Sequence, residues 1–244
     1  MTKINFKRDG LTLVGQVERP FAEKYDLAIL LHGLGDNQDT SLMRKLSSSL
    51  RNAGIANIRF DFSGQGGSSG KLEEMTIFSE LADASTVLEE VRSNPHVNNI
   101  YLIGHSMGGV VATLLADLYP DLLPKLVLLA PAASLKDYIN NGELMGTSFD
   151  PNNIPNKVRA GKLTLGSLFF RSFKNLSIYG SAGRYKGEVN IIQGTNDEAV
   201  AVSYAQKFDH VFPNSQLNLI ENADHSFTES FEDKAVDQVI KFLK

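Results

Sequence analysis

The most informative stretch of the chain is Ile100-Tyr-Leu-Ile-Gly-His-Ser-Met-Gly-Gly109, in which an apolar run leads into the pattern Gly-x-Ser-x-Gly. An apolar segment with helical spacing, Val110–Tyr119, follows directly. A serine in a sharp turn between a strand and a helix needs small neighbours on both sides, and Gly104 and Gly108 provide them. The pattern predicts that the Ser106 hydroxyl lies above a sheet, at the positive end of a helix. The alternative is an ordinary glycine-rich turn that happens to contain a serine.

Short apolar runs that end in glycine or polar residues recur along the chain and are typical of strands buried on both faces. They are Leu27–Leu31, Ile58–Phe62, Ile100–Ile103, Leu126–Leu129, Val189–Ile192 and Leu217–Ile220. Segments with helical spacing lie between them, and a β-hairpin with its turn at Arg8-Asp9-Gly10 opens the chain. Alternating strands and helices predict one α/β domain over residues 1–244, with a mainly parallel central sheet flanked by helices.

One interval interrupts this alternation. Residues 132–186 offer no comfortable strand–helix unit and are rich in Asn, Gly, Pro and aromatic residues. A connection of this length inside a compact domain is usually functional, and we interpret it as an inserted cap subdomain. A disordered surface excursion is the alternative, but the apolar residues of the interval favour a packed segment. These residues are Leu163, Leu165, Leu168, Phe169, Phe170 and Phe173.

Composition excludes several classes of function. The chain contains no Cys, which rules out disulfides, a cysteine nucleophile and thiolate metal sites. Its net charge of -4 at pH 7 argues against a basic surface for nucleic acid. No run approaches the roughly 18 apolar residues of a membrane span, and the amino-terminal residues lack the apolar core of a signal peptide. We therefore expect a cytoplasmic protein with no nucleic-acid partner and no membrane span.

A serine hydroxyl needs a base to become nucleophilic, and histidine is the usual one. His225 follows the last apolar run, where the carboxyl end of a strand meets the edge at which α/β proteins build their sites. The other four histidines, His32, His96, His105 and His210, lie in turns or in polar segments. His105 is inside the Ser106 turn, where its side chain cannot turn back on the hydroxyl. We predict that His225 is the base; a loop histidine without a catalytic role is the alternative.

The third member of such a site is a carboxylate that orients the imidazole. Asp197 lies just past the run Val189–Ile192, and the chain order Ser106, Asp197, His225 is the order of a strand–turn–helix serine site. Two other carboxylates compete. Asp224 is adjacent to His225, and adjacent side chains on an extended segment point apart. Asp61 begins a glycine-rich stretch that is better explained as a tight loop beside the site, so Asp197 is the predicted acid.

Two further groups should stabilise the negative charge that develops on a substrate carbonyl oxygen. One is the backbone N–H of Met107, directly after the serine. The other is expected from the loop Leu31-His-Gly-Leu-Gly35, at the N–H of Leu34; a plain turn is the competing interpretation.

The sequence predicts neither a metal nor a cofactor. The spacing of Asp36, Asp39, His32 and His225 matches no common metal site. The run from Gly64 to Lys71 lacks the spacing of a phosphate-binding loop, and no dinucleotide-binding pattern opens a helix near the amino terminus.

With these residues located, the sequence resembles the bacterial cinnamoyl (feruloyl) esterases of the α/β-hydrolase superfamily. The resemblance runs nearly end to end. Its motifs are HGLG at 32–35, RFDFSGQGGSSGK at 59–71, GHSMGG at 104–109, LLAPAA at 128–133, GTND at 194–197 and ADHSF at 223–227. The catalytic motifs are shared across the superfamily, whereas the insertion and its start in LLAPAASLKDY are more specific. The resemblance implies an α/β-hydrolase fold with an inserted cap, no cofactor, and a homodimer in many members.

In that family the cap shapes a pocket for an aromatic acyl group, and polar cap residues meet the ring hydroxyls. The resemblance implies that Asp137 and Tyr138 could serve as such contacts, whereas Met145 stands where a polar residue is expected. Aromatic cap residues, Phe169 among them with Phe170 and Phe173, would offer surface to the acyl ring.

The predicted function is therefore serine-dependent hydrolysis of carboxylic esters of the hydroxycinnamate type, through an acyl-enzyme on Ser106, with a small-molecule ester as the partner. A monoacylglycerol lipase or a thioesterase would share every catalytic residue and differ only in the cap. An acyltransferase, in which an alcohol or amine replaces water, is a further alternative. Outside the enzymes, the alternative is a binding protein that retains the fold.

Overall fold

The computed structural model describes residues 1–244 and is built on one eight-stranded sheet, with strand order β1-β2-β4-β3-β5-β6-β11-β12. Its strands are β1 (Thr2–Arg8), β2 (Leu11–Glu18), β3 (Tyr25–Leu31), β4 (Ala56–Phe60), β5 (Val97–His105), β6 (Lys125–Leu129), β11 (Glu188–Gly194) and β12 (Ser215–Ile220). β1 and β2 pair antiparallel, as do β2 and β4, and all other neighbours are parallel. This confirms the predicted mainly parallel sheet.

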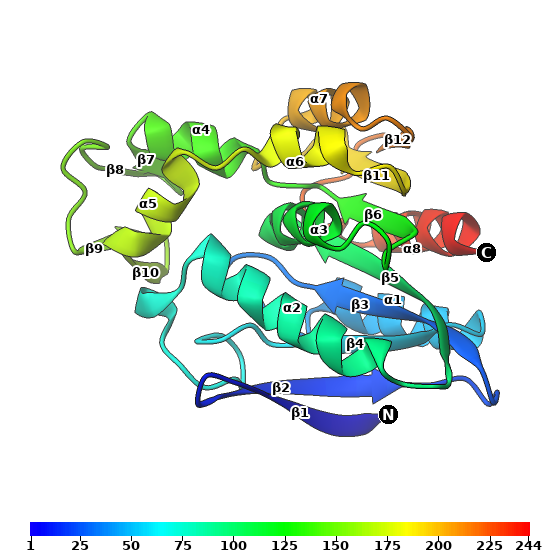
Figure 1. Ribbon diagram of the computed structural model, residues 1–244. Coiled ribbons are helices and arrows are strands. Elements are labelled where there is room, and N and C mark those ends of the chain that lie inside the picture. Colours follow the sequence, from blue (N-terminus) through cyan, green and yellow to red (C-terminus); the bar gives the residue numbers. More distant parts are fainter.

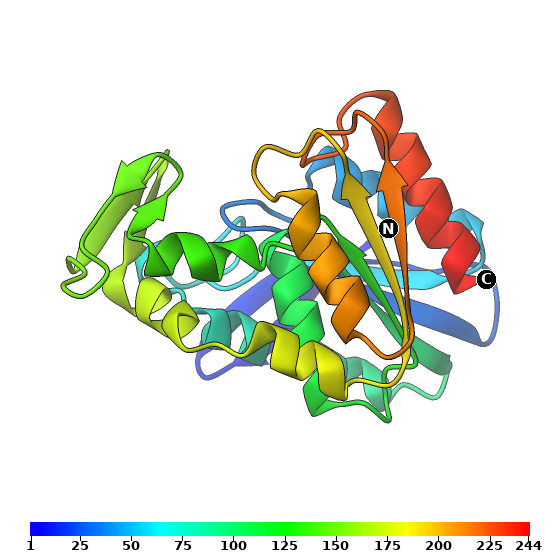
Figure 2. The same ribbon diagram turned by 90° about the horizontal axis from the view of Figure 1, so that it is seen from above.

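Helices cover both faces of the sheet (Figures 1 and 2). One face carries α1 (Ser41–Asn52) and α8 (Ser230–Leu243). The other carries α2 (Ile77–Arg92), preceded by the short 3-10 helix η1 (Leu72–Glu74), together with α3 (Met107–Leu118), α6 (Ile178–Arg184) and α7 (Val202–Val211). In α1 the buried residues Leu42, Leu46 and Leu50 recur at the spacing of one helical face, so the helix packs through a single apolar stripe.

The predicted hairpin at the start of the chain is present. Asp9 and Gly10 form its turn, with φ angles of 48° and 81°. Positive φ at both central residues is what a two-residue turn of type I′ requires, and its twist matches that of the strands. The turn pairs Arg8 with Leu11 and thereby sets the register of β1 on β2.

The expectation that the run Leu217–Ile220 is buried on both faces is wrong. β12 is the last strand of the sheet and pairs only with β11, so its outer edge is open. Leu219 is 45% exposed. Only Ile220 of this strand is buried, because the strand lies at the open edge of the sheet.

The insertion, residues 132–186, lies between β6 and β11. It contains α4 (Ser134–Asn140), a hairpin of β7 (Glu143–Leu144) and β8 (Thr147–Ser148), a second hairpin of β9 (Lys157–Ala160) and β10 (Leu163–Gly166), α5 (Ser167–Lys174), and α6. The part from α4 to α5 extends past the carboxyl ends of the parallel strands (Figure 1, left). α6 instead packs with α3 and α7 in the layer over the sheet. The projecting segment is therefore shorter than the interval that interrupts the sequence pattern.

Aromatic packing holds the projecting segment together. Phe169, Phe170 and Phe173 of α5 are fully buried, and the ring centroid of Phe169 lies 5.3 Å from that of Phe170 and 5.1 Å from that of Phe173. The interval is thus packed, as its apolar content predicts. The expectation that Leu168 is also buried is wrong: it is 59% exposed, because the buried stripe of α5 contains the three phenylalanines instead.

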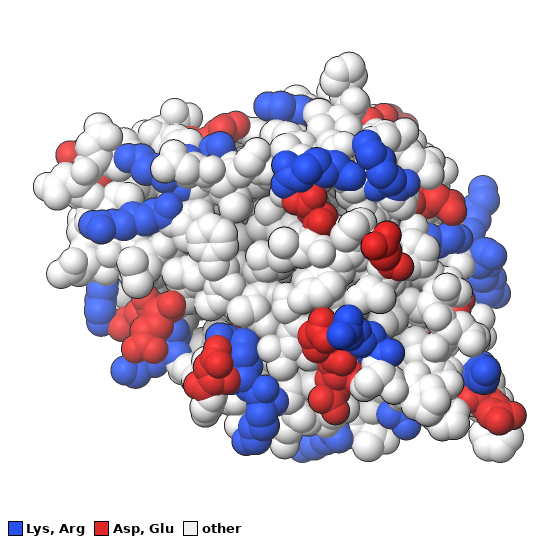
Figure 3. Space-filling view, in the orientation of Figure 1, with Lys and Arg blue, Asp and Glu red and all other residues white.

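Charged side chains of both signs are interspersed over the face shown in Figure 3, and neither sign forms a continuous surface there. None of the helices combines the length and the apolar character that crossing a membrane would need.

The packing of α5 generates a stability prediction. Phe173→Ala should lower the free energy of unfolding by about 3–5 kcal/mol, the usual cost of emptying a fully buried aromatic site. Leu168→Ala, in the same helix, should change it by less than about 0.5 kcal/mol because the side chain is exposed. Urea unfolding followed by circular dichroism measures both. Equal losses in the two variants would contradict the packing described for α5.

Candidate active site

The Ser106 turn is built from close backbone contacts. Ser106 lies between β5 and α3 with φ of 55° and ψ of -122°, a backbone conformation that few side chains adopt. A Cβ at Gly104 would lie 2.3 Å from the carbonyl oxygen of Gly108, and one at Gly108 would lie 2.2 Å from that of Leu31. Any larger residue at these two positions would push α3 away from the sheet, so the glycines permit the turn.

Three loops at the carboxyl edge of the sheet bring Ser106, His225 and Asp197 together. The Ser106 hydroxyl is 2.9 Å from Nε2 of His225, and Nδ1 of the same ring is 2.8 Å from Oδ2 of Asp197. With the ring proton on Nδ1, His225 donates to the carboxylate and accepts from the serine hydroxyl. This is the geometry in which an imidazole removes the proton of a nucleophile while a carboxylate stabilises the resulting charge.

Asp197 is held as an anion by its surroundings. Burial alone would raise the pKa of this carboxyl, but the hydrogen bond and the charge of His225, together with other donors, outweigh burial and lower the pKa. The backbone N–H groups of Ala199 and Val200 donate to Oδ1, at 2.9 and 2.8 Å. A carboxylate with this many donors stays ionised, as its role beside the imidazole requires.

The sequence reasoning missed Gln193. Its side chain is fully buried, and Nε2 donates to Oδ2 of Asp197 at 2.7 Å and to the carbonyl of Val200 at 3.2 Å. Gln193 therefore fixes both the carboxylate and the turn that follows it. The available signal was a polar residue directly after the apolar pair Ile191-Ile192 and before Gly194, at the end of the strand.

His105 holds the loop that carries the base. Its side chain is directed away from the Ser106 hydroxyl, and its Nε2 is 3.0 Å from the backbone carbonyl of His225, to which a protonated Nε2 donates. The two imidazole rings lie 5.2 Å apart. Burial, and secondarily the neighbouring His225, lower the pKa of His105 to about 4, so its ring is neutral near pH 7.

The two competing carboxylates have other partners. Asp61 accepts from the backbone N–H of Gln38 and of Gly67, at 2.7 and 2.8 Å, and so braces the glycine-rich loop. Asp224 accepts from the backbone and hydroxyl of Thr228, at 2.8 and 2.7 Å. Neither carboxylate contacts the ring of His225.

The loop after β3 lies against the serine. A Cβ at Gly33 would be 3.0 Å from Cβ of Ser106. The backbone N–H of Leu34 has no hydrogen-bond partner in the protein, and Met107 is the first residue of α3, so its N–H has no partner within the helix. Two unpaired donors beside a serine hydroxyl can receive the oxygen of a tetrahedral intermediate.

A chain of buried side chains supports this loop. Gln65 accepts from the backbone N–H of Gly35 at 2.8 Å and donates to Glu80 at 2.7 Å. Burial raises the pKa of the Glu80 carboxyl well above its ordinary value. His32 accepts from the backbone N–H of Phe62 at 3.2 Å, which ties the loop to the end of β4. The loop is thus fixed before any ligand arrives.

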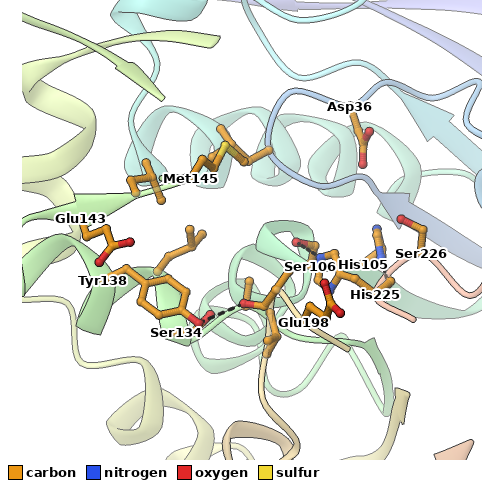
Figure 4. Close-up of a pocket in the computed structure, with 16 residues that line it drawn as sticks. Asp36, His105, Ser106, Ser134, Tyr138, Glu143, Met145, Glu198, His225 and Ser226 are labelled. Carbon is orange, nitrogen blue, oxygen red and sulfur yellow. Dashed lines mark hydrogen bonds between the residues drawn. The ribbon is translucent and has the colours of Figure 1, made fainter. Parts of the chain in front are cut away.

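A cavity of about 540 Å³ opens above Ser106 (Figure 4). It extends from Tyr138, Glu143 and Met145 of the insertion, past the serine, to Asp36 on the far side. Half of its sixteen lining residues are apolar. The Tyr138 hydroxyl donates to the carbonyl of Ala199 at 3.2 Å and so joins the insertion to the turn after Asp197.

The structure separates the predicted substrate contacts into two groups. Tyr138 and Met145 line the cavity, as does Leu34, which was predicted as a donor to the carbonyl oxygen. Asp137 does not: its carboxylate accepts from the hydroxyl of Tyr204 at 2.9 Å, because α4 turns this residue towards α7. Phe169 does not either, since it is fully buried in the aromatic packing of α5. Residues that line the cavity but were not predicted include Asp36, His105, Glu143, Glu198 and Val200.

No group of three or more His, Asp or Glu side chains is arranged to hold a metal ion. The site residues that are present are those of nucleophilic acyl transfer: a hydroxyl with a base, a carboxylate behind the base, and two free N–H groups.

Residues 23–169 match the family Hydrolase_4, described as serine aminopeptidase, S33. The chain belongs to this family. The solved structure of Est1E from Butyrivibrio proteoclasticus with ferulic acid bound has a TM-score of 0.95 and 28% sequence identity, and the match covers 98% of this chain and 97% of that one. These findings confirm the α/β-hydrolase fold and the resemblance stated from the motifs.

Two curated relatives match shorter stretches. Putative esterase/lipase 2 of Mycoplasma genitalium is 26% identical over 135 residues, which is 55% of this chain and 48% of the relative. The mitochondrial palmitoyl-protein thioesterase ABHD10 of Mus musculus is 35% identical over 83 residues, which is 34% of this chain and 27% of the relative. The matches thus span about half or less of these relatives.

The site generates a prediction about the acid. Asp197→Asn should slow covalent labelling of Ser106 by a fluorophosphonate by about 10⁴-fold, as for turnover in other serine triads, because an amide favours the wrong imidazole tautomer. Asp224→Asn, in the same loop as the base, is the matched control and should slow labelling by less than about tenfold, since its carboxylate touches only Thr228. If Asp224→Asn or Asp61→Asn were the slowest variant, the acid would be misassigned.

Proposed function

We propose that this protein hydrolyses carboxylic esters, with Ser106 as nucleophile, His225 as base and Asp197 as the acid that orients it. The observation that carries the proposal is the continuous chain of hydrogen bonds from the Ser106 hydroxyl through the His225 ring to Asp197, at 2.9 and 2.8 Å, at the floor of an open cavity. Membership of a hydrolase family and similarity to Est1E and to the Mycoplasma esterase/lipase support it.

The reaction proceeds in two steps. The Ser106 oxygen attacks the ester carbonyl carbon while Nε2 of His225 takes the hydroxyl proton, and the N–H groups of Leu34 and Met107 hold the carbonyl oxygen as it becomes negative. The carbon–oxygen bond to the alcohol breaks as His225 returns its proton to the leaving oxygen. Water, deprotonated by the same ring, then attacks the carbonyl carbon of the acyl-enzyme. The bond from this carbon to the Ser106 oxygen breaks as His225 returns the proton to that oxygen, and the acid is released.

We further propose that the acyl group is of the aryl-acrylic, hydroxycinnamate type and that the segment from α4 to α5 acts as its cap. The bound ferulic acid of Est1E, at 28% identity over nearly the whole chain, supports the class of acid. Leu135, Tyr138, Leu144 and Met145 of that segment line the cavity and offer apolar surface to a flat ring.

The structure alters the reason for expecting an aromatic acyl group. Phe169 and its neighbours were expected to contact the ring, but they are buried inside the insertion, and Tyr138 is the aromatic side chain that lines the cavity. Met145 brings no hydrogen-bonding group of ordinary strength to the same end, so a ring hydroxyl gains little there. Glu143 lies beside Tyr138 (Figure 4), and no hydrogen bond within the protein occupies its carboxylate.

Ser106→Ala should abolish ester hydrolysis, with a loss on the order of 10⁴-fold or more in kcat, and should leave the unfolding midpoint within a few degrees of the wild type. Fluorophosphonate labelling of the wild type, located on Ser106 by mass spectrometry, is the companion measurement. A variant that keeps more than a tenth of the activity would mean that another residue is the nucleophile, and a wild type that neither labels nor cleaves esters would mean a binding protein.

The acyl preference is tested with methyl esters of different acids, so that the alcohol is the same in every substrate. Methyl cinnamate and methyl ferulate should have similar kcat/KM values, and both should exceed methyl decanoate, because a flexible chain loses more rotamer entropy on entering the cavity. Met145→Gln should raise the ferulate-to-cinnamate ratio by roughly threefold to tenfold by adding a hydrogen-bonding partner. A preference of the wild type for decanoate would refute the aryl class, and a preference for palmitoyl thioesters would favour the thioesterase alternative.

A further inference from the structure

A second cavity adjoins the first on the side of Ser106 away from the insertion. It has a volume of about 330 Å³ and shares Asp36, His105 and Ser226 with the cavity above the serine. These shared residues lie at the opposite end of the close-up from Tyr138 and Met145, with Ser106 between the two ends (Figure 4). The nucleophile therefore lies at the junction of two hollows.

The chemistry of ester cleavage assigns a direction to each half of the substrate. The leaving oxygen takes its proton from Nε2 of His225, so the alcohol must lie on the side of that ring. Ser226 and Thr228 follow His225 in the same loop, and both line the second cavity. The acyl half then extends the other way, towards the apolar residues of the insertion.

The second cavity has the lining of a polar subsite. Of its nine lining residues only Leu42 is apolar, and the others present hydroxyls, carboxylates and the ring of His105. No Lys or Arg lines either cavity. A hydroxyl-bearing group could exchange its hydrogen bonds with water for hydrogen bonds with this surface, whereas a large apolar alcohol could not.

Asp36 is the most informative of these residues. Its carboxylate makes no hydrogen bond within the protein and points into the cavity (Figure 4). The position that a Cβ would take at Gly33 is 3.2 Å from Oδ2 of Asp36 and 3.0 Å from Cβ of Ser106. The carboxylate and the nucleophile thus flank the same glycine. An acceptor left unpaired this close to the reacting atoms is free for a donor on the substrate.

The charges around the second cavity do not cancel. Asp36, Glu229 and Glu232 line it. The N-termini of α1 and α8 also face it, and each helix end is equivalent to about half a positive charge, so together they offset about one carboxylate. Lys45 is nearest to Asp233, at 2.5 Å, and lies 3.7 Å from Glu232. His105 is neutral. The cavity therefore remains negative.

We propose that the second cavity binds the alcohol half of the ester, that Asp36 contacts this alcohol directly as a specificity-determining residue, and that the alcohol is polar and carries no negative charge. The proposal rests on the esterase function proposed above. It excludes phosphorylated and carboxylated alcohols as efficient substrates and favours those with hydroxyl or ammonium groups.

A series of esters with one acyl group and different alcohols tests the proposal. Butyrate esters of glycerol, choline and glycerol 3-phosphate supply a neutral, a cationic and an anionic alcohol, and each rate is divided by the rate of alkaline hydrolysis of the same ester. At low ionic strength kcat/KM for the phosphate ester should be about tenfold or more below that for the glycerol ester, and the choline ester should at least equal the glycerol ester. The differences should shrink at 0.5 M salt because these charges are partly exposed.

Variants locate the effect. Asp36→Asn should reduce the discrimination against the phosphate ester by about threefold or more, and Glu229→Gln should reduce it in the same direction. Glu143→Gln is the matched control: it removes the same charge at the acyl end of the first cavity and should leave the ratio among the three alcohols nearly unchanged. Circular dichroism spectra and unfolding midpoints show whether each variant is folded.

The outcomes separate this proposal from the one on which it rests. If methyl butyrate and all three esters resist hydrolysis, the esterase function fails, and the subsite with it. If the three esters are cleaved at equal corrected rates, or the phosphate ester is preferred, the enzyme is an esterase and the subsite proposal is wrong. Equal effects of Asp36→Asn and Glu143→Gln on the ratio of kcat/KM among the three esters would also overturn it. Such a result would mean that the overall negative charge of the cleft, and not a contact with Asp36, causes the discrimination.

Discussion

The position of Ser106 depends on one close approach, between the first turn of α3 and the end of β3. A Cβ at Gly108 would lie 2.2 Å from the carbonyl oxygen of Leu31, so helix and strand meet with no side chain between them. The loop with Leu34 begins where β3 ends, and the same contact brings the free N–H of Leu34 to the side of the serine. The strained turn, with φ of 55° at Ser106, persists because backbone packs against it from both sides.

Around this contact, the base and the acid are held by bonds that do not involve the nucleophile. His105 donates to the backbone of His225, and Gln193 holds both Asp197 and the carbonyl of Val200. These bonds tie side chains of the sheet edge to the two loops that carry the polar groups. The geometry therefore exists before substrate binds, and binding free energy is not spent on assembling it.

The sequence was sufficient to predict the sheet, the Ser106 turn and the proximity of Ser106, Asp197 and His225. Each of these three residues follows an apolar run, and the carboxyl ends of parallel strands lie at a common edge of the sheet. The sequence was insufficient for the insertion. Whether Asp137 or Tyr138 faces the cavity depends on the rotation of α4, a helix of seven residues whose pattern has no long apolar stripe to fix it. The phenylalanines of α5 were correctly expected to pack. Because they are buried within the insertion, they cannot also line the cavity and contact a ligand.

The cleft is asymmetric, and the asymmetry follows from how its two ends are made. The end proposed for the acyl group is lined by α4 and the β7–β8 hairpin, which belong to the insertion, whereas the other end is lined by the N-termini of α1 and α8, which belong to the layers on the sheet. A helix that packs on the sheet cannot turn or shift without disturbing the core beneath it. The segment from α4 to α5 instead projects past the sheet, and it contacts the sheet layers mainly through β10 and α5, which pack against η1 and α2. Substitutions in α4 and the β7–β8 hairpin can therefore reshape this end while Asp36 and the loop of His225 stay in place, whereas Leu163 of β10 packs on Gly35, beside Asp36. On the proposed assignment of the two ends, substitutions in α4 and the β7–β8 hairpin should change the preference for the acid more than the preference for the charge of the alcohol.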